Sequence, residues 1–307
     1  MTRFRRNEFD VTNRINTTDP ACVKAEVCRI HRALYSGARA PALERAFGDL
    51  AALYRGENPA YEKCDTAYHD LQHVLEVSLA MARLLDGYER TRGGAPALGE
   101  RLFQLGIVCA LCHDVGYVRR KGDRLHRRGA EYTQTHVTRG GRFLKEYLPT
   151  LGLGEFVAVA SQVLHFTGYE RPVAAIRLAN PMHRLLGSLL GSADIIAQMS
   201  DRCYLEKCHG RLYPEFVDGG IARRVTDTGV EMMFHSADDL VRKTPGFFEN
   251  ASRRLHQDLG GAHRYAQAHF GGEDFYWEAL QQNIDFARQL PERPSLLLRR
   301  VPPVTIN

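Results

Sequence analysis

Apolar residues recur at three- and four-residue intervals along most of this sequence, whereas the alternating pattern of half-buried strands is scarce. The clearest stripe starts at His73 and runs through Val77, Met81, Leu84 and Leu85. Residues at this spacing lie on one face of an α-helix. Similar stripes occur at 101–112, 130–148, 154–166, 182–209, 236–257 and 275–289, and glycine or proline clusters separate them. The pattern predicts an all-α helical bundle whose helices are joined by short turns.

The sequence is expected to form one helical domain with an appended segment at each end. At 307 residues the chain is long enough for one large core, and no change in composition marks a linker to a second domain. We expect a polar N-terminal arm at 1–20, a single domain at 21–290 and an extended, proline-containing strap at 291–307.

The bulk properties favour a cytoplasmic protein. Its apolar runs are too short to cross a bilayer, and no apolar segment follows the basic N-terminus, so no signal peptide is apparent. The seven cysteines are odd in number and irregularly spaced, which is typical of reduced thiols. A net charge of +5 is compatible with an anionic substrate. We expect neither membrane association nor stable nucleic-acid binding.

Histidine and aspartate form an ordered series through the middle of the chain. His69 and His73 are four residues apart, so they project from one face of a helix. Asp114 and Asp194 lie in or beside long apolar runs, and a buried carboxylate is costly unless it has a partner. A cation is the natural partner. The candidate metal-binding residues are His73, His113, Asp114, His136, His165 and Asp194.

The donor set of this series suits two divalent metal ions. Imidazole and carboxylate together bind zinc, iron or manganese, and a bridging carboxylate with water also takes magnesium. One aspartate can bridge two cations, and Asp114 is the candidate for that role. Two metals about 3.5–4 Å apart can generate a bridging hydroxide and stabilise both the attacking and the leaving oxygen. The series therefore indicates metal-assisted chemistry at phosphorus or a similar centre.

Two segments of this series resemble segments of a known enzyme family. Tyr68-His-Asp-Leu-Gln-His-Val-Leu-Glu-Val resembles the YHNxxHAxxV signature of class I cyclic nucleotide phosphodiesterases. Ala110-Leu-Cys-His-Asp-Val-Gly resembles their ALxHD segment. Both belong to the HD-domain superfamily of metal-dependent phosphohydrolases. The resemblance covers roughly residues 60–250 and implies an HD-domain, phosphodiesterase-like helical bundle.

The resemblance implies a role for each matching residue. A metal-bridging hydroxide is the expected nucleophile, and His69 corresponds to the general acid that protonates the leaving oxygen. Histidine suits this task because its side chain titrates near neutrality. Glu273-Asp274 is the expected source of a carboxylate beside the acid. The ligands of the tighter-binding metal correspond to His73, His113, Asp114 and Asp194.

The second metal differs from that of the animal class I enzymes, in which water fills most of its coordination sphere. Thr135-His136-Val-Thr-Arg-Gly-Gly resembles the THPxxG segment of HD-GYP cyclic dinucleotide phosphodiesterases, and His165 falls where that group has a further histidine. His136 and His165 are therefore expected to anchor the second metal. The chain lacks the GYP motif and has Tyr117 where that group has lysine, so membership of the HD-GYP group itself is not expected.

The expected substrate pocket also departs from the class I pattern. Those enzymes hold the purine with a glutamine followed closely by a phenylalanine. This chain has Thr244 in place of the glutamine and keeps Phe247, which is expected to stack on a base while the choice of base stays open. Arg202 and Tyr204, two turns beyond the metal aspartate, are candidate substrate contacts. The basic segment 119–128 is either a lip that steers phosphate or a solvated loop.

The function expected first is a binuclear metal-dependent phosphodiesterase that hydrolyses a cyclic nucleotide or a related small nucleotide. A di-iron oxygenase resembling myo-inositol oxygenase uses the same order of ligands, but it needs no acid at the position of His69. A phosphomonoesterase or nucleoside triphosphate hydrolase would combine the same metal site with a different pocket. A non-catalytic nucleotide-binding protein ranks below these, because every expected ligand is present. The sequence leaves the nucleotide, the metals and the oligomeric state open, a homodimer included.

Overall fold

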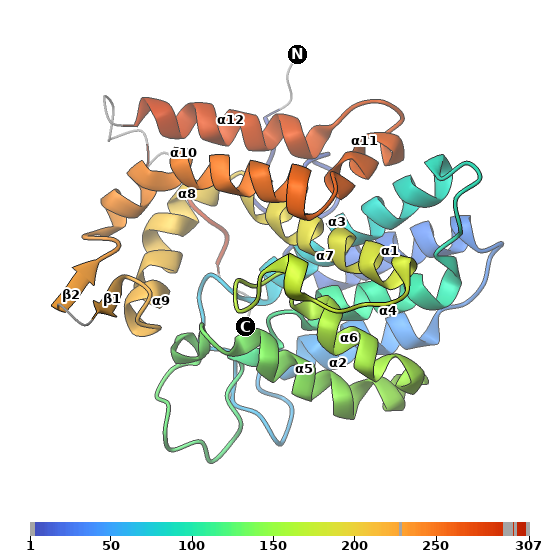
Figure 1. The fold of residues 1–307 in the computed structure, drawn as a ribbon, viewed down its shortest axis with the longest axis horizontal. Helices are drawn as coiled ribbons and strands as arrows, with labels where there is room; N and C mark the ends of the chain where they lie inside the picture. The colour runs from blue at the N-terminus through green and yellow to red at the C-terminus, as the bar shows by residue number, and fades with distance from the viewer. Residues whose placement is uncertain (1–3, 227–228, 291–296, 298–299, 305–307) are drawn as a thin grey trace.

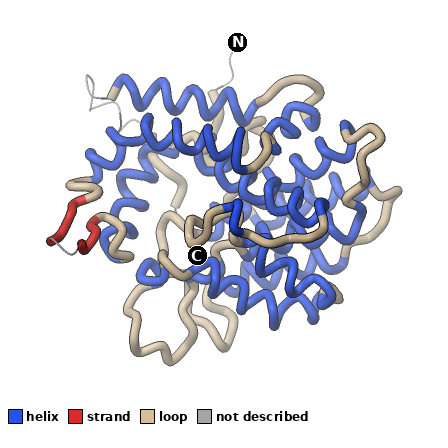
Figure 2. Tube along the Cα trace, viewed as in Figure 1, coloured by secondary structure: helices blue, strands red, loops and turns tan. Residues whose placement is uncertain are grey.

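The computed structural model describes residues 4–226, 229–290, 297 and 300–304. Within this part of the chain the fold is all-α apart from one short hairpin, as the sequence predicts (Figures 1 and 2). The hairpin pairs β1 (Arg223–Thr226) with β2 (Gly229–Met232) in antiparallel register. The helices are α1 (Pro20–Leu34), α2 (Pro41–Tyr54), α3 (Leu71–Thr91), α4 (Gly99–Cys112), α5 (His136–Tyr147), α6 (Val157–Leu164), α7 (Pro181–Ser200), α8 (Tyr204–Lys207), α9 (Tyr213–Asp218), α10 (Ala237–Arg253), α11 (Tyr265–His269) and α12 (Phe275–Gln289).

The predicted stripes correspond to helices in the structure. Four helices coincide with a predicted stripe to within a few residues at each end. They are α4 at 101–112, α6 at 154–166, α10 at 236–257 and α12 at 275–289. The stripe at 182–209 is divided between α7 and α8, because the Asp201 side chain accepts the Cys203 backbone N–H at 2.9 Å and turns the chain there. In the stripe at 130–148, α5 begins at His136 after a short 3-10 turn. The first two helices, α1 and α2, lie where no stripe was singled out.

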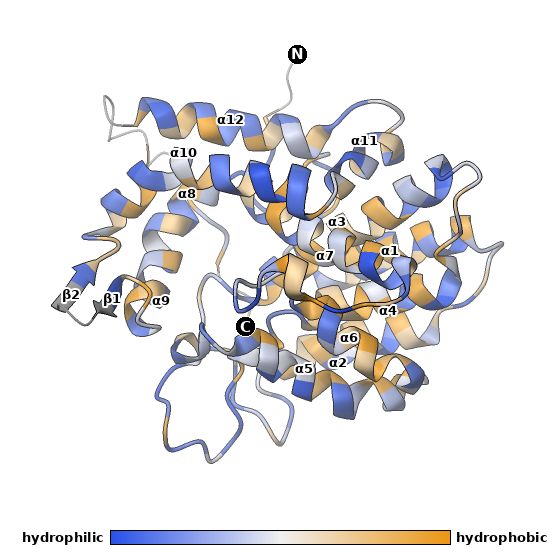
Figure 3. Ribbon diagram, viewed as in Figure 1, coloured by the Kyte–Doolittle hydropathy of each residue, from blue (hydrophilic) through white to orange (hydrophobic). Residues whose placement is uncertain are grey.

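Helix α3 is the centre of the bundle. Every residue from Leu71 to Tyr88 is buried except Glu76, which is half-buried. The helix is therefore enclosed by protein on every side rather than on one face. It packs against α1, α4, α7 and α11. The contact with α11 requires glycine at Gly87, because a Cβ there would lie 1.8 Å from the Tyr265 carbonyl oxygen. By contrast, hydrophilic and hydrophobic residues alternate along α10 and α12 (Figure 3), as expected of helices with one face on the core.

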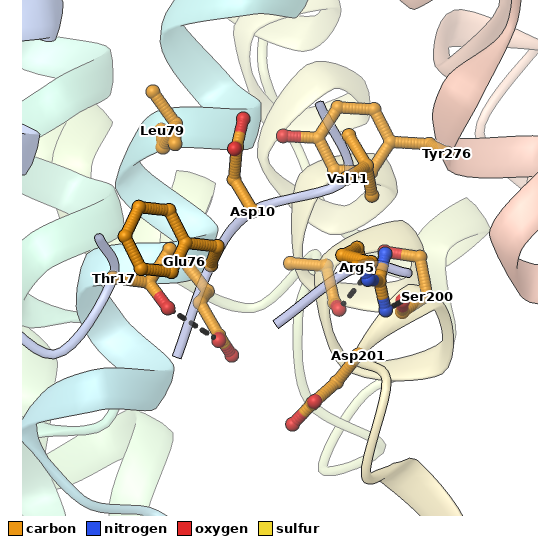
Figure 4. A pocket seen from close by; sticks show the side chains of 11 residues that line it. Arg5, Asp10, Val11, Thr17, Glu76, Leu79, Ser200, Asp201 and Tyr276 are labelled. Atoms are coloured by element: carbon orange, nitrogen blue, oxygen red, sulfur yellow. Dashed lines mark hydrogen bonds between the residues drawn. The ribbon is translucent and has the colours of Figure 1, made fainter. Parts of the chain in front are cut away.

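The N-terminal arm is packed onto this core. Residues 4–19 contain turns but no helix. Buried Asp10 forms an ion pair with buried Arg83 of α3, and Arg83 also donates to the Tyr276 hydroxyl of α12 at 2.9 Å. Thr17 hydrogen-bonds Glu76 at 3.0 Å across the small hollow drawn in Figure 4. These buried contacts hold the arm against α3 and α12.

The predicted strap at 291–307 falls largely outside the described residues, which include only Leu297 and 300–304 of it. Within the described part of the chain, no helix is both long enough and apolar enough to cross a membrane. All seven cysteines are free thiols, and Cys22 alone among them is exposed.

Candidate metal centre

Three helices bring four of the predicted ligands together. His73 lies in the first turn of α3, where the Asp70 side chain caps the helix by accepting the His73 backbone N–H at 3.0 Å. His113 and Asp114 follow the end of α4. Asp194 comes from the middle of α7. All four side chains are buried.

The ligand atoms of these residues converge on one point. The Nε2 atoms of His73 and His113 lie 3.3 Å apart. Asp114 Oδ2 lies 3.1 Å from His113 Nε2 and 3.3 Å from His73 Nε2. Asp194 Oδ1 lies 3.5 Å from His73 Nε2. The group formed by His73, His113 and Asp114 can hold a metal ion.

The orientation of His113 suits coordination. Its Nδ1 lies 2.8 Å from the Ala110 carbonyl oxygen, to which it donates a proton, so the lone pair of a neutral ring is on Nε2 and faces the centre. Asp114 Oδ2 is buried and accepts no hydrogen bond among the described residues. Two imidazole nitrogens that face each other beside an unbonded carboxylate oxygen form a donor set that a divalent cation satisfies.

The electrostatics favour positive charge at the same point. Burial lowers the pKa of His73, but the carboxylates of Asp114 and Asp194 outweigh burial and raise that pKa to about 10. Burial raises the pKa of Asp114, yet the imidazole of His113 holds it well below its usual range. The two carboxylates therefore stabilise a positive charge between them.

His136 faces the other oxygen of the bridging candidate. Its Nε2 lies 3.6 Å from Asp114 Oδ1, and its Nδ1 lies 2.7 Å from the Thr133 carbonyl oxygen, which accepts its proton. Burial lowers the pKa of His136 more than Asp114 raises it, so the ring is neutral, as a ligand must be. Glycine at position 116 allows this approach, because a Cβ on Gly116 would lie 1.9 Å from the His136 carbonyl oxygen.

His165 is placed beside His136 rather than beside Asp114. It is buried at the end of α6, and its Nδ1 lies 3.8 Å from Glu170 Oε2. Burial lowers the pKa of His165, and the positive charge of Arg171 lowers it further. His165 is thus neutral and near the second ligand, but the described contacts do not join it to the four converging residues.

A histidine–glutamate pair lies next to the converging ligands. His69 Nδ1 lies 2.5 Å from Oε2 of Glu215, a buried residue of α9. The other oxygen of Glu215 accepts the Tyr68 backbone N–H, also at 2.5 Å. The rings of His69 and His73 are 5.8 Å apart. Both oxygens of one carboxylate therefore fix the segment that carries His69.

The expectation that Glu273-Asp274 supplies this carboxylate is wrong. Asp274 caps α12 instead, where its side chain accepts the Trp277 backbone N–H at 3.0 Å. Glu215 follows Pro214 in the first turn of a short helix, and nothing in the local pattern distinguishes it from a surface glutamate.

Tyr117 separates the two outer histidines of the site, a role that the sequence did not reveal. Its buried ring stacks on His69 with centroids 4.4 Å apart and planes 17° apart. On its other face it stacks on His136, with centroids 4.5 Å apart and planes 18° apart. The three rings therefore form one column beside Asp114.

The predicted substrate contacts are dispersed. Phe247 is 40% exposed, and the Thr244 hydroxyl donates to the Leu240 carbonyl at 3.3 Å within α10. Tyr204 is buried. Arg202 is at the N-terminal arm, where its Nε donates to Asn7 Oδ1 at 3.0 Å. The role of these four residues in substrate binding stays a prediction.

The basic segment at 119–128 is partly neutralised by its neighbours. Three of its arginines form ion pairs at 3.3–3.4 Å, and their carboxylate partners come from three separate parts of the fold. This pairing favours the solvated loop over the phosphate-steering lip. The pairs are Arg119 with Asp65, Arg120 with Glu146 and Arg128 with Asp218.

Comparison of the chain with protein-family models, with curated proteins and with solved structures gave no match.

Proposed function

We propose that this protein is a binuclear metal-dependent phosphodiesterase that hydrolyses a cyclic nucleotide or a related small nucleotide diester. The observation that carries the proposal is the position of the His69–Glu215 pair beside the converging ligands His73, His113 and Asp114. A cation site alone fits many reactions. A site with an oriented proton donor beside it fits the cleavage of a bond whose leaving oxygen must be protonated.

The geometry of Asp114 supports two cations rather than one. Its Oδ2 faces His73 and His113, whereas its Oδ1 faces His136. A carboxylate whose two oxygens face separate imidazole ligands is arranged to bridge. His73, His113 and Asp194 would hold one metal ion, and His136 would hold the other, with Asp114 shared. When bound, such ions supply Lewis acidity and activate water for attack on phosphorus.

The chain's own contribution is the proton. Nδ1 of His69 is engaged by Glu215, so its Nε2 is the atom free to give a proton. As the oxygen of a water molecule bonds to phosphorus and the bond between phosphorus and the leaving oxygen breaks, that oxygen takes the proton from Nε2 and becomes a hydroxyl group. Glu215 holds the ring in one orientation, while Tyr117 prevents the ring from tilting toward His136.

The experiment that tests this function begins with metal analysis of the purified protein. We then assay cyclic mononucleotides, cyclic dinucleotides, nucleoside monophosphates and nucleoside triphosphates with manganese or magnesium, and we record oxygen uptake in parallel. The expected result is hydrolysis of a diester without oxygen uptake. Turnover of monophosphates or triphosphates alone, or oxygen uptake by an iron-loaded protein, would favour another reaction on the same scaffold and overturn the proposal.

Two variants separate the metal site from the proton donor. His113→Ala should lose bound metal, because it removes one of the buried imidazole ligands. His69→Ala should keep its metal but lower kcat by about 100-fold or more, the usual contribution of general acid catalysis. If His69→Ala retains full activity at normal metal content, the role proposed for this histidine is wrong.

A further inference from the structure

A second hollow lies at the meeting point of segments that are far apart in the sequence. It has an empty volume of about 490 Å3 and opens to solvent. Three arginines line it: Arg5 of the N-terminal arm, Arg202 between α7 and α8, and Arg300 of the C-terminal segment. We call it the arginine hollow. It shares Arg5 and Val11 with the hollow of Figure 4, and none of its lining residues is a candidate metal ligand.

None of these three guanidinium groups has an ion-pair partner within the described part of the chain. Each is held instead by neutral acceptors. Arg5 donates to the Ser200 carbonyl oxygen at 2.6 Å, and Arg202 donates to the Asn7 side chain at 3.0 Å. Arg300 donates to the Arg202 carbonyl oxygen and, at 3.3 Å, to Asn283 Oδ1.

The like charges in the arginine hollow repel one another. Burial lowers the pKa of Arg202, and the charge of Arg300 lowers it further. Burial also lowers the pKa of Arg5, and the charge of Arg202 lowers it further, whereas the carboxylates of Asp201 and Glu76 raise it. Asp201 itself forms an ion pair with Lys207 at 2.5 Å. A guanidinium that is both partly buried and close to a like charge is stabilised when an anion binds.

The nearby carboxylates do not neutralise the cluster. Glu278 lines the wall of the hollow but is exposed and makes no ion pair with the three arginines. Glu206 is buried behind Arg202 and Arg300, and neither of its oxygens accepts a hydrogen bond among the described residues. Burial raises the pKa of Glu206 to about 7, so near neutral pH it carries only part of a negative charge.

We propose that the arginine hollow binds the phosphate group of a small nucleotide, at a site separate from the metal centre. Arginine presents a planar set of donors that matches phosphate oxygens, and three arginines from three segments can surround one phosphate. Phe275 and Val11 supply an apolar wall on which a base can lie, and Gln282 adds a polar side chain to the lining. A bound phosphate would join the N-terminal arm and the C-terminal segment to α12.

The test is calorimetric titration of the EDTA-treated full chain with inorganic pyrophosphate, with adenosine monophosphate and with adenosine. We expect both phosphorylated probes to bind at one site per chain with an affinity that falls as salt rises, and adenosine alone not to bind. Tighter binding of adenosine monophosphate than of pyrophosphate would assign the base to the apolar wall. Equal binding of the two would mean that the hollow recognises an inorganic anion and not a nucleotide. Absence of binding by either phosphorylated probe would overturn the proposal.

Variants place the binding within the molecule. Arg202→Gln and Arg300→Gln should each weaken the affinity about tenfold or more, because each removes a charge-assisted contact. Arg288→Gln is the matched control, since Arg288 lies on α12 but pairs with Asp285 at 3.1 Å and does not line the hollow. The melting temperature of each variant checks that it is folded. If Arg202→Gln is unstable, the affinity of Arg300→Gln for the phosphorylated probes tests the proposal instead.

The proposal does not depend on catalysis. His113→Ala, which should lose metal, should bind pyrophosphate as the wild type does. If His113→Ala abolishes the binding and Arg300→Gln leaves it intact, the anion binds at the metal centre and the arginine hollow is not a site. Failure of the diesterase assay leaves this result unaffected.

Discussion

Replacement of Glu215 by glutamine probes the proton donor with the smallest possible change. The carboxylate accepts two hydrogen bonds, one from His69 Nδ1 and one from the Tyr68 backbone N–H, each at 2.5 Å. The amide of Glu215→Gln has one acceptor oxygen and one donor nitrogen, so it can serve only one of these two donors. Because Glu215 is buried, water does not replace the missing acceptor.

The magnitude follows from this mismatch. A buried donor left without an acceptor costs about 1–3 kcal/mol. If the amide nitrogen of the glutamine faces His69, Nδ1 of His69 must act as the acceptor. A protonated His69 ring then loses both its hydrogen bond to residue 215 and the attraction of a carboxylate charge. A loss of that size in the transition state lowers kcat by about 5- to 160-fold. If the amide oxygen faces His69, the ring still loses its charged partner, and the Tyr68 N–H is left unpaired at a cost in stability.

The assay measures kcat and KM for a nucleotide diester that the activity panel shows to be hydrolysed, because its alkoxide leaving oxygen needs a proton, together with metal content and melting temperature. We expect kcat of Glu215→Gln to fall with KM and metal content little changed. Glu215→Asp keeps the charge and should recover part of the activity. Glu206→Gln is the matched control for kcat, because that buried carboxylate accepts no hydrogen bond among the described residues. Unchanged kcat and melting temperature in Glu215→Gln would refute the reasoning.

Two further predictions concern the histidine column and a buried acid. Tyr117→Leu removes two ring stacks, each worth about 0.5–1.5 kcal/mol. We expect its kcat to fall at normal metal content, whereas Tyr117→Phe, which keeps the ring, should retain wild-type kcat. An unchanged kcat in Tyr117→Leu would show that the stacking has no part in turnover. Burial raises the pKa of Glu206 from 4.5 to about 7, so the folded state keeps a proton that the unfolded state loses, and stability drops as pH rises through this window. The free energy of unfolding of Glu206→Gln, measured in urea, should therefore equal that of the wild type near pH 4 and exceed it by up to about 3 kcal/mol above pH 7. An equal difference between the two proteins at both pH values would contradict this.

Helix positions were predictable because local spacing controls them. The stripe from His73 to Leu85 corresponds to α3, and the proline at position 181 marks the start of α7. The position of His73 was also predictable, since Asp70 precedes it at capping distance and fixes the first turn of the helix. These features depend on residues within a few positions of one another, so the linear pattern contains them.

Contacts between distant segments were not predictable in the same way. Glu273-Asp274 appeared to be a suitable carboxylate, but Asp274 caps its own helix, and Glu215 occupies the place beside His69. Arg202 appeared to be close to the metal aspartate along α7, but a turn after Ser200 directs it to the N-terminal arm. In each case, the direction of a side chain depends on a turn that short-range spacing does not specify.

The sequence by itself determined the helical class of the fold and the residue types of the candidate metal site, because periodicity and residue chemistry are local properties. Tertiary structure decided which carboxylate meets His69, that Tyr117 separates two imidazole rings, and that Arg5, Arg202 and Arg300 line one hollow. These arrangements join residues at least 19 positions apart in the chain, as Tyr117 and His136 are. Only the packing of helices around α3 brings them within hydrogen-bonding or stacking distance.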